Sequence, residues 1–158
     1  MKAPVGVYPM RSYLWFPLLA LLLSPSFLQA SGECIPTPHR TTGTHYKPVT
    51  VQKVDVSQGI VVSGRVLAAP DCTPVPAAKV AHWQAGEQGK YVDRLRAYLF
   101  SDKNGHYRFQ TEWPNLASPH IHFIVTAAGY ETLETQWRGH ARVNIIEFDI
   151  VLRKLSWD

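Results

Sequence analysis

The 158-residue sequence has few of the features that mark several common protein classes. It has only two cysteines, no run of lysines and arginines, and no helical stripe of apolar residues longer than about two turns. Without clustered basic residues it lacks the charge pattern of proteins that bind nucleic acid or a membrane surface. We therefore expect neither partner, and a fold made mainly of strands.

Long hydrophobic runs are also missing. The longest apolar stretch, residues 13–23, is shorter than the roughly 20 residues that span a bilayer. Lys2 and Arg11 precede it, and small residues ending at Ala30 follow it, which is the order of a secretory signal peptide. We predict cleavage after Ala30 and a periplasmic or extracellular protein with no membrane segment after cleavage. A retained membrane helix is the weaker alternative.

The mature chain predicted by this cleavage has 128 residues, enough for one domain with one core. Loss of Lys2 and Arg11 lowers the count of Lys and Arg from 16 to 14, against 12 acidic residues, so the net charge falls from +4 to +2. No repeat or linker divides the chain. We expect an N-terminal arm over residues 31–50 and a β-sandwich domain over residues 51–158.

Cys34 and Cys72 are the only cysteines, and they do not have the spacing of a metal site. In an oxidising compartment such a pair is expected to form a disulfide, which would tie the arm to the first strands. Two free thiols are the alternative. Glu33 stands where a lipoprotein signal would have a small residue before Cys34, which argues against lipidation.

Strands are predicted from alternating apolar residues bounded by turn residues. The arm carries three prolines and little periodicity, whereas the sequences VQKVDV (51–56), GIVVSGRVL (59–67) and AKVAHW (78–83) have period two. The turn sequence at 102–105 separates residues 98–100 from HYRFQT (106–111), which predicts a hairpin. HIHFIVTA (120–127) and VNIIEFDIVL (143–152) are two further strands. Short, closely spaced strands favour an all-β sandwich.

His120 and His122 flank one residue of a predicted strand. Side chains two positions apart point to the same face of a sheet, so both imidazoles can converge on one ion, while Ile121 and Phe123 turn into apolar packing. Alone, the pair is a weak signal, since two histidines on a half-exposed strand are commoner than a metal site.

The surrounding motifs resemble, in order, those of the intradiol ring-cleavage dioxygenases. The matching segments are GRV (64–66), PVPAAKV (74–80), WQA (83–85), GKY (89–91), SDKNGHYRFQT (101–111), PHIHF (119–123) and TQ (135–136). The arm TPHRTTGTHY (37–46) is similar to the Thr-Pro-x-Gln-Thr-x-Gly-Pro-Tyr-Tyr arm of that family. The resemblance covers about residues 34–153.

This resemblance implies a β-sandwich that holds Fe(III) with tyrosinate and histidine ligands and cleaves a catechol-type aromatic diol with O2. By position, Tyr91, His120 and His122 match metal ligands of the family, and Gln136 matches a glutamine that orients or stabilises the substrate. Tyr91 matches the tyrosine that stays bound when substrate enters. It and Gln136 are therefore the candidate catalytic residues.

One departure concerns the segment between Pro114 and His120. In the family this segment is longer and carries a second tyrosine ligand and an arginine near the substrate, whereas here only residues 115–119 fill it. Loss of a positioned base commonly costs about 10²- to 10⁴-fold in rate. The shortened segment therefore leaves open a metal-binding protein without turnover.

Four further side chains are candidates to complete the ligand set: His82, Tyr98, His45 and Tyr46. A single histidine or tyrosine is more often a packed, hydrogen-bonded residue than a ligand.

Three functions follow from these observations. The first is a secreted Fe(III) dioxygenase for an aromatic diol. The second is a non-catalytic protein that binds copper or iron, because histidines with one tyrosine also suit Cu(II). The third is a binding module without metal, since sandwich folds host many functions.

Overall fold

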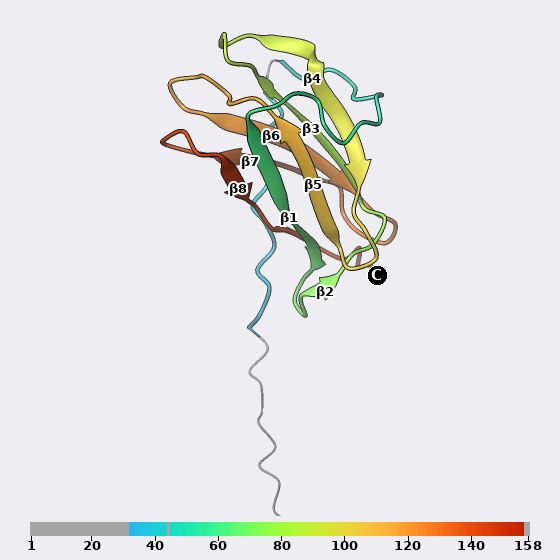
Figure 1. The fold of residues 1–158 in the computed structure, drawn as a ribbon. Helices are drawn as coiled ribbons and strands as arrows, with labels where there is room; N and C mark the ends of the chain where they lie inside the picture. The colour runs from blue at the N-terminus through green and yellow to red at the C-terminus, as the bar shows by residue number, and fades with distance from the viewer. Residues whose placement is uncertain (1–31, 44, 157–158) are drawn as a thin grey trace, which may run out of the picture. The chain divides into compact units, whose positions relative to one another are not determined.

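The chain folds as two facing β-sheets in the computed structural model, which describes residues 32–43 and 45–156 (Figure 1). The strands of this part of the chain are β1 (Ile60–Ala68), β2 (Thr73–Pro74), β3 (Lys79–Ala85), β4 (Tyr91–Phe100), β5 (His106–Thr111), β6 (His120–Thr126), β7 (Leu133–Arg138), β8 (Ile145–Glu147) and β9 (Ile150–Leu152). The predicted all-β sandwich is confirmed.

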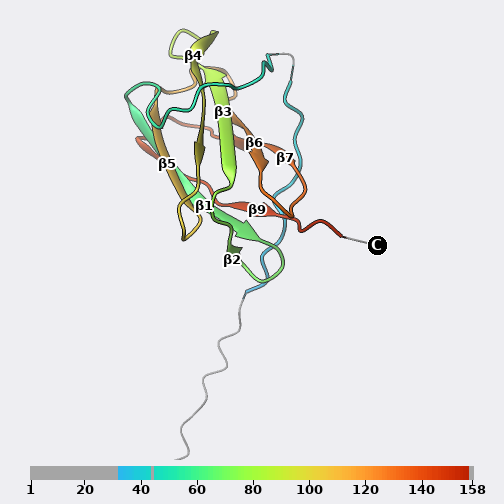
Figure 2. The same cartoon turned by 90° about the vertical axis from the view of Figure 1, so that its right-hand side faces the viewer.

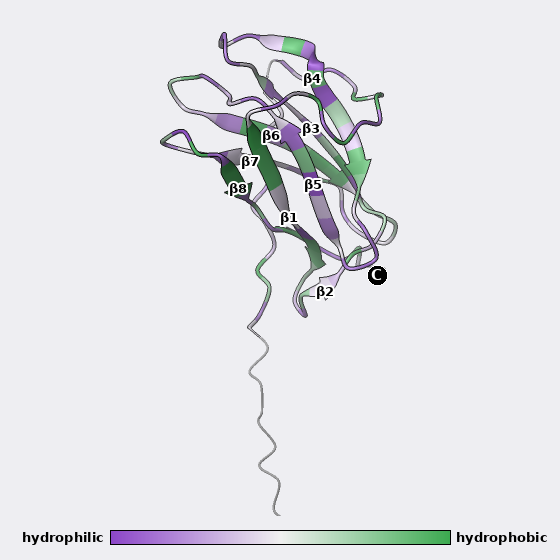
Figure 3. Cartoon of the chain, viewed as in Figure 1, coloured by the Kyte–Doolittle hydropathy of each residue, from purple (hydrophilic) through white to green (hydrophobic). Residues whose placement is uncertain are grey.

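The first sheet is organised around β1. This strand pairs with β5 and with the short β2 in antiparallel fashion, and with β8 and β9 in parallel. Its apolar residues alternate toward the interior, and Val62 and Val66 are fully buried. Figure 3 shows green, hydrophobic residues on β1 and β8, whereas β5 carries more purple, hydrophilic positions.

The second sheet has the order β4-β3-β6-β7, and all its neighbours are antiparallel. Ile121 and Phe123 of β6 point inward and join the main core, as expected from the alternation of HIHF. Aromatic packing links the sheets, since the ring of Phe123 lies 6.3 Å from that of Phe109 on β5. The opposite face of this sheet carries His120 and His122.

The predicted hairpin between residues 98–100 and 106–111 is wrong. The turn at 102–105 is present, and Asp102 accepts backbone hydrogen bonds from Asn104 and His106. However, β4 pairs with β3, and β5 crosses to the other sheet to pair with β1. The turn reverses the chain between the two layers of the sandwich.

The predicted strand over residues 143–152 is divided into β8 and β9. The division lies at Phe148 and Asp149, where the backbone crosses Gly64 of β1. A Cβ atom on Gly64 would lie 2.0 Å from the carbonyl oxygen of Phe148, so only glycine allows this approach. Beside it, the side chain of Asp149 accepts a hydrogen bond from the backbone N–H of Arg65.

Residues 51–56 form no strand, contrary to their alternating pattern. Gln52 makes an isolated parallel bridge to Tyr98 at the edge of β4, and Val56 donates a backbone hydrogen bond to Gln110. The residues before them first lie along the edge strand β7, where the backbone N–H of Arg40 donates to the backbone carbonyl oxygen of Glu134, and then cross the outer face of the sheet at His45 and Tyr46. Figure 2 shows this arm rising beside β7 before it turns toward β3 and β4.

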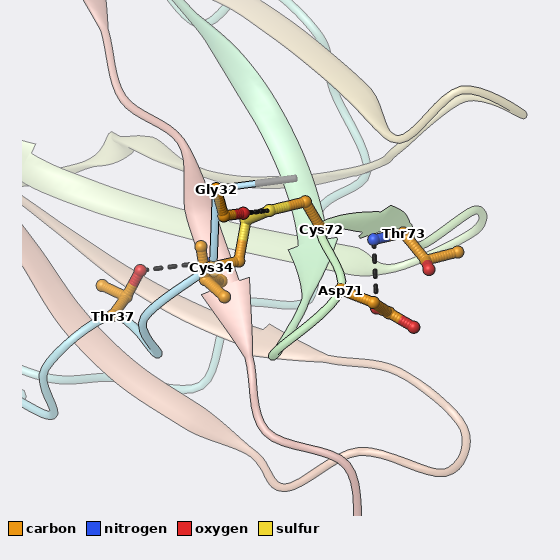
Figure 4. The surroundings of a disulfide bond; sticks show 7 residues. Gly32, Cys34, Thr37, Asp71, Cys72 and Thr73 are labelled. Carbon is orange, nitrogen blue, oxygen red and sulfur yellow. Dashed lines mark hydrogen bonds between the residues drawn. A yellow bond between two sulfur atoms is a disulfide. The ribbon is translucent and has the colours of Figure 1, made fainter. Parts of the chain in front are cut away.

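The start of the arm is fixed by a disulfide between Cys34 and Cys72, as predicted (Figure 4). Cys72 lies in the turn between β1 and β2, so the bridge joins the arm to the first sheet. The predicted signal peptide, residues 1–30, falls outside the described residues. Within the described part of the chain, no helix has the length and apolar character to cross a membrane.

Candidate metal centre

The two histidines predicted to share a face do so at the start of β6. His122 pairs across the sheet with Trp83 of β3 and Gln136 of β7, and His120 pairs with Arg138. His122 is buried, with 4% of its surface exposed, and His120 is partly exposed. The site therefore lies on the outer face of the second sheet, near one end of the sandwich.

Tyr91 reaches the same face through an irregularity in the pairing of β3 with β4. Trp83 pairs with Arg96, and the next outer residue of β3, Ala85, pairs with Tyr91. Regular antiparallel pairing would place Arg94 opposite Ala85. Extra residues in β4 therefore bulge from the ladder and bring Tyr91 into line with the histidines.

The phenol of Tyr91 lies between the two imidazoles. Its Oη atom is 2.8 Å from Nε2 of His120 and 3.1 Å from Nε2 of His122. Donor atoms that lie about 2.1 Å from one ion and at right angles to each other are separated by about 3 Å. The separations of these donor atoms thus fit a shared ion, and residues up to 31 positions apart in sequence meet at one point.

The hydrogen bonding of His120 also suits coordination. Its Nδ1 atom lies 2.7 Å from the carbonyl oxygen of Ser118. A carbonyl oxygen only accepts, so Nδ1 carries the proton and Nε2 presents its lone pair toward Tyr91. Histidine ligands are commonly oriented in this way by a hydrogen bond from the distal nitrogen.

His122 is held by packing. Its ring stacks on the indole of Trp83, with centroids 4.9 Å apart and planes within 4° of parallel. Burial, and after it the positive charges of Arg138 and Arg96, lower the pKa of His122 to about 4. The imidazole is therefore neutral near pH 7, which is the form that binds a metal ion.

Opposing effects act on the phenol of Tyr91. Burial raises its pKa above the usual value, and the positive charge of Arg96 acts in the opposite direction. Without an ion the phenol remains protonated at neutral pH, so it donates to one imidazole and can accept an N–H from the other. A cation at this point would stabilise the phenolate in place of these hydrogen bonds.

The four additional candidate ligands lie in different places. His45 stacks on the ring of Tyr91, and Tyr46 meets the indole of Trp83 edge-on. His82 points to the other side of the sheet, where its ring stacks on Phe109. Tyr98 lies further along β4, where the Lys79 ammonium sits over its ring. The structure brings neither His82 nor Tyr98 to the cluster.

Gln136 lies beside the cluster, and Arg138 accompanies it. The Gln136 side chain donates to the carbonyl oxygen of Thr41 and accepts a hydrogen bond from the Arg138 guanidinium. Sequence reasoning missed Arg138 and the buried Arg96. Arg138 could have been found from its position two residues after Gln136 in one strand, which places both side chains on the same face of the sheet.

No cluster of three or more His, Cys, Asp or Glu residues suited to a metal ion occurs in residues 32–43 and 45–156. The candidate centre depends on a phenol as its third donor. Phenolate and imidazole are hard to borderline donors that suit Fe(III) or Cu(II), so the residues present fit the predicted metals.

Sequence comparison gives a partial match. No family model matches the chain. A hydroxyquinol 1,2-dioxygenase from Rhodococcus opacus is 33% identical over 90 residues, a match that covers 39% of this chain and 30% of the relative. The match thus spans less than a third of that relative's length.

Structural comparison gives a broader likeness. The dioxygenase domain of a dioxygenase and carbohydrate-binding protein fusion from Streptomyces sp. SirexAA-E has a TM-score of 0.68 and 23% identity, and the match covers 77% of this chain and all of that one. An intradiol ring-cleavage dioxygenase from Tetranychus urticae has a TM-score of 0.60 and 21% identity, with 65% of each chain covered. The chain has the intradiol dioxygenase fold and a distant sequence similarity to a hydroxyquinol 1,2-dioxygenase, which confirms the predicted resemblance.

Proposed function

We propose that Tyr91, His120 and His122 hold one Fe(III) ion and that the protein cleaves the ring of a catechol-type aromatic diol. The observation that carries this proposal is the position of the Tyr91 oxygen, 2.8 and 3.1 Å from the two imidazole nitrogens. The shared fold and the distant similarity to hydroxyquinol 1,2-dioxygenase support the choice of reaction.

When bound, the iron would take up the two oxygens of the diol and make its ring reactive toward O2. The two imidazoles supply neutral nitrogen donors, and Tyr91 supplies an anionic oxygen that favours the oxidised metal. Both atoms of O2 enter the product as the bond between the hydroxyl-bearing carbons breaks, so no external reductant is needed. Gln136 orients the diol by hydrogen bonding. Arg138, which donates to Gln136, supplies a positive charge beside the diol.

Metal loading provides the direct test. Protein loaded with Fe(III) is expected to show a visible tyrosinate-to-iron charge-transfer band and to consume O2 with catechol or hydroxyquinol. Tyr91→Phe should remove the band, and His120→Ala or His122→Ala should reduce iron uptake. Tyr98→Phe is the matched control, because this phenol lies on the same strand but away from the cluster. A colourless loaded protein that consumes no O2 would refute the proposal.

A second candidate function is non-catalytic binding of Cu(II) or iron. It is favoured by the short connection between Pro114 and His120, which carries neither tyrosine nor arginine. Elemental analysis of protein from its native compartment would separate the two functions. Copper near one ion per chain, lost in His120→Ala, together with no O2 consumption, would favour the second.

We also propose that the protein works outside the cytoplasm after cleavage at Ala30. The disulfide between Cys34 and Cys72 supports this, because such bonds persist in oxidising compartments. Mass spectrometry of the mature protein should find Ser31 at its N-terminus. An intact N-terminus on the exported protein would contradict the cleavage site.

A further inference from the structure

Of the three proposed ligands, Tyr91 has the fewest backbone hydrogen bonds of regular sheet structure around it. His120 and His122 belong to an interior strand that pairs on both sides. Tyr91 instead opens an edge strand, directly after the turn at residues 86–90 and before the irregular part of β4. A phenol placed 2.8 and 3.1 Å from two nitrogens needs some other contact to fix its ring.

The arm provides this contact through His45. The imidazole of His45 lies flat on the phenol ring of Tyr91, with centroids 4.3 Å apart and planes 12° from parallel. The core fills the side of the sheet that faces away from His45. The two proposed histidine ligands approach Tyr91 at its phenol oxygen, on the edge of the ring. His45 thus covers the ring face of Tyr91 while leaving its oxygen free.

Arg96 holds His45 in this position. Its guanidinium donates a hydrogen bond of 2.8 Å to the backbone carbonyl oxygen of His45. Arg96 is itself 93% buried and makes an ion pair of 3.4 Å with Asp93. A buried guanidinium loses little conformational freedom on binding, so this contact can fix the arm at His45.

We infer that His45, anchored by Arg96, is a positioning residue that fixes the phenol of Tyr91 between the two imidazoles. It acts through stacking and not as a fourth ligand. The lone pairs of an imidazole lie in the plane of its ring. In a near-parallel stack they point alongside the phenol ring, away from the point where Oη and the other two nitrogens converge. The positioning of Tyr91 is independent of metal, whereas its effect on metal binding rests on the proposed function.

The metal-free protein tests the contact itself. We would label the tyrosines with 3-fluorotyrosine, assign the Tyr91 ¹⁹F resonance by its loss in Tyr91→Phe, and record it in His45 variants. His45→Ala should shift and narrow the resonance, because the ring loses its stacked neighbour. His45→Phe should keep it broad, since a flat ring is restored. His39→Ala is the control, a histidine of the same arm that lies by Glu134.

The same variants test the consequence for metal binding. His45→Ala should weaken Fe(III) affinity and charge-transfer intensity by about 10-fold, the lower end of the range for residues that orient ligands. His45→Phe should restore most of both. If His45→Phe loses as much as His45→Ala, His45 acts as a ligand and the inference fails. An unchanged ¹⁹F resonance in His45→Ala also overturns it.

Arg96→Met tests the anchor in the metal-free protein. It removes the hydrogen bond to His45 while keeping a long side chain, and it should move the Tyr91 resonance in the same direction as His45→Ala. The double variant should shift the Tyr91 resonance no further than His45→Ala alone, because Arg96 acts on Tyr91 through His45. If wild-type protein binds no iron but the ¹⁹F results are as expected, the proposed function fails and the positioning of Tyr91 stands.

Discussion

The fully buried histidine of β3 allows a quantitative prediction about stability. His82 has no exposed surface, its ring stacks on Phe109 with centroids 3.7 Å apart, and neither ring nitrogen has a hydrogen-bond partner. Burial lowers the pKa of His82 from 6.5 to about 3. We predict that His82 contributes a loss of folding stability as the pH falls below 6.5, and the lowered pKa of His122 acts in the same direction.

The sign follows from proton binding. Between pH 6.5 and about 3, the unfolded chain protonates His82 and the folded chain does not, so acid favours unfolding. The stabilising contribution is fully present above pH 6.5 and is lost as the pH falls toward the folded pKa. The slope approaches about 1.4 kcal/mol per pH unit but is about half of that at pH 6.5, where half of the unfolded chains are protonated, so the loss between pH 6.5 and 4.5 is about 2 kcal/mol.

Replacement by phenylalanine isolates this effect. His82→Phe keeps a flat ring against Phe109, removes the two unpartnered nitrogens and cannot titrate. Urea unfolding from pH 7.5 to 4.5 should show the variant gaining about 2 kcal/mol relative to wild type at the acid end. The matched control is His140→Gln, which removes an exposed histidine. Parallel stability curves for wild type and His82→Phe would refute the reasoning.

Two further predictions concern the fold. Gly64→Ala should destabilise the protein by about 3 kcal/mol or more or prevent its accumulation, because the added Cβ would meet the backbone oxygen of Phe148; a wild-type midpoint in thermal unfolding would contradict the close approach. Reduction of the bond between Cys34 and Cys72 should lower the free energy of unfolding by about 4 kcal/mol, because it closes a loop of 38 residues; equal urea midpoints with and without reductant would contradict this.

Local patterns predicted most strands correctly because alternation reports burial on one face of a sheet. The strands β1, β3 and β6 lie close to their predicted ranges. The failures came from interactions between distant residues. A turn sequence shows that the chain reverses but not which strand it pairs with, and the split of residues 143–152 depends on Gly64, about 80 positions earlier.

The same distinction applies to the candidate centre. The spacing of His120 and His122 predicted their shared face, which follows from strand geometry alone. Tyr91 was identified only through the resemblance, because no local pattern indicates where an irregular edge strand rejoins its neighbour. His45 was a candidate ligand from the sequence, but its stacking on Tyr91 and its anchor from Arg96 depend on how the arm crosses the sheet and were not predicted.

The irregular segment of β4 between Tyr91 and Arg96, residues 92–95, acts as a spacer. The number of residues in this spacer, more than their identity, sets the position of the Tyr91 phenol. Between Tyr91 and Arg96 only Leu95 is fully buried, while Asp93 and Arg94 are exposed. Each of the two exposed residues makes an ion pair, Asp93 with Arg96 and Arg94 with Glu112. Removal of even one residue from the spacer would shift Tyr91 along the strand and reverse the face it occupies.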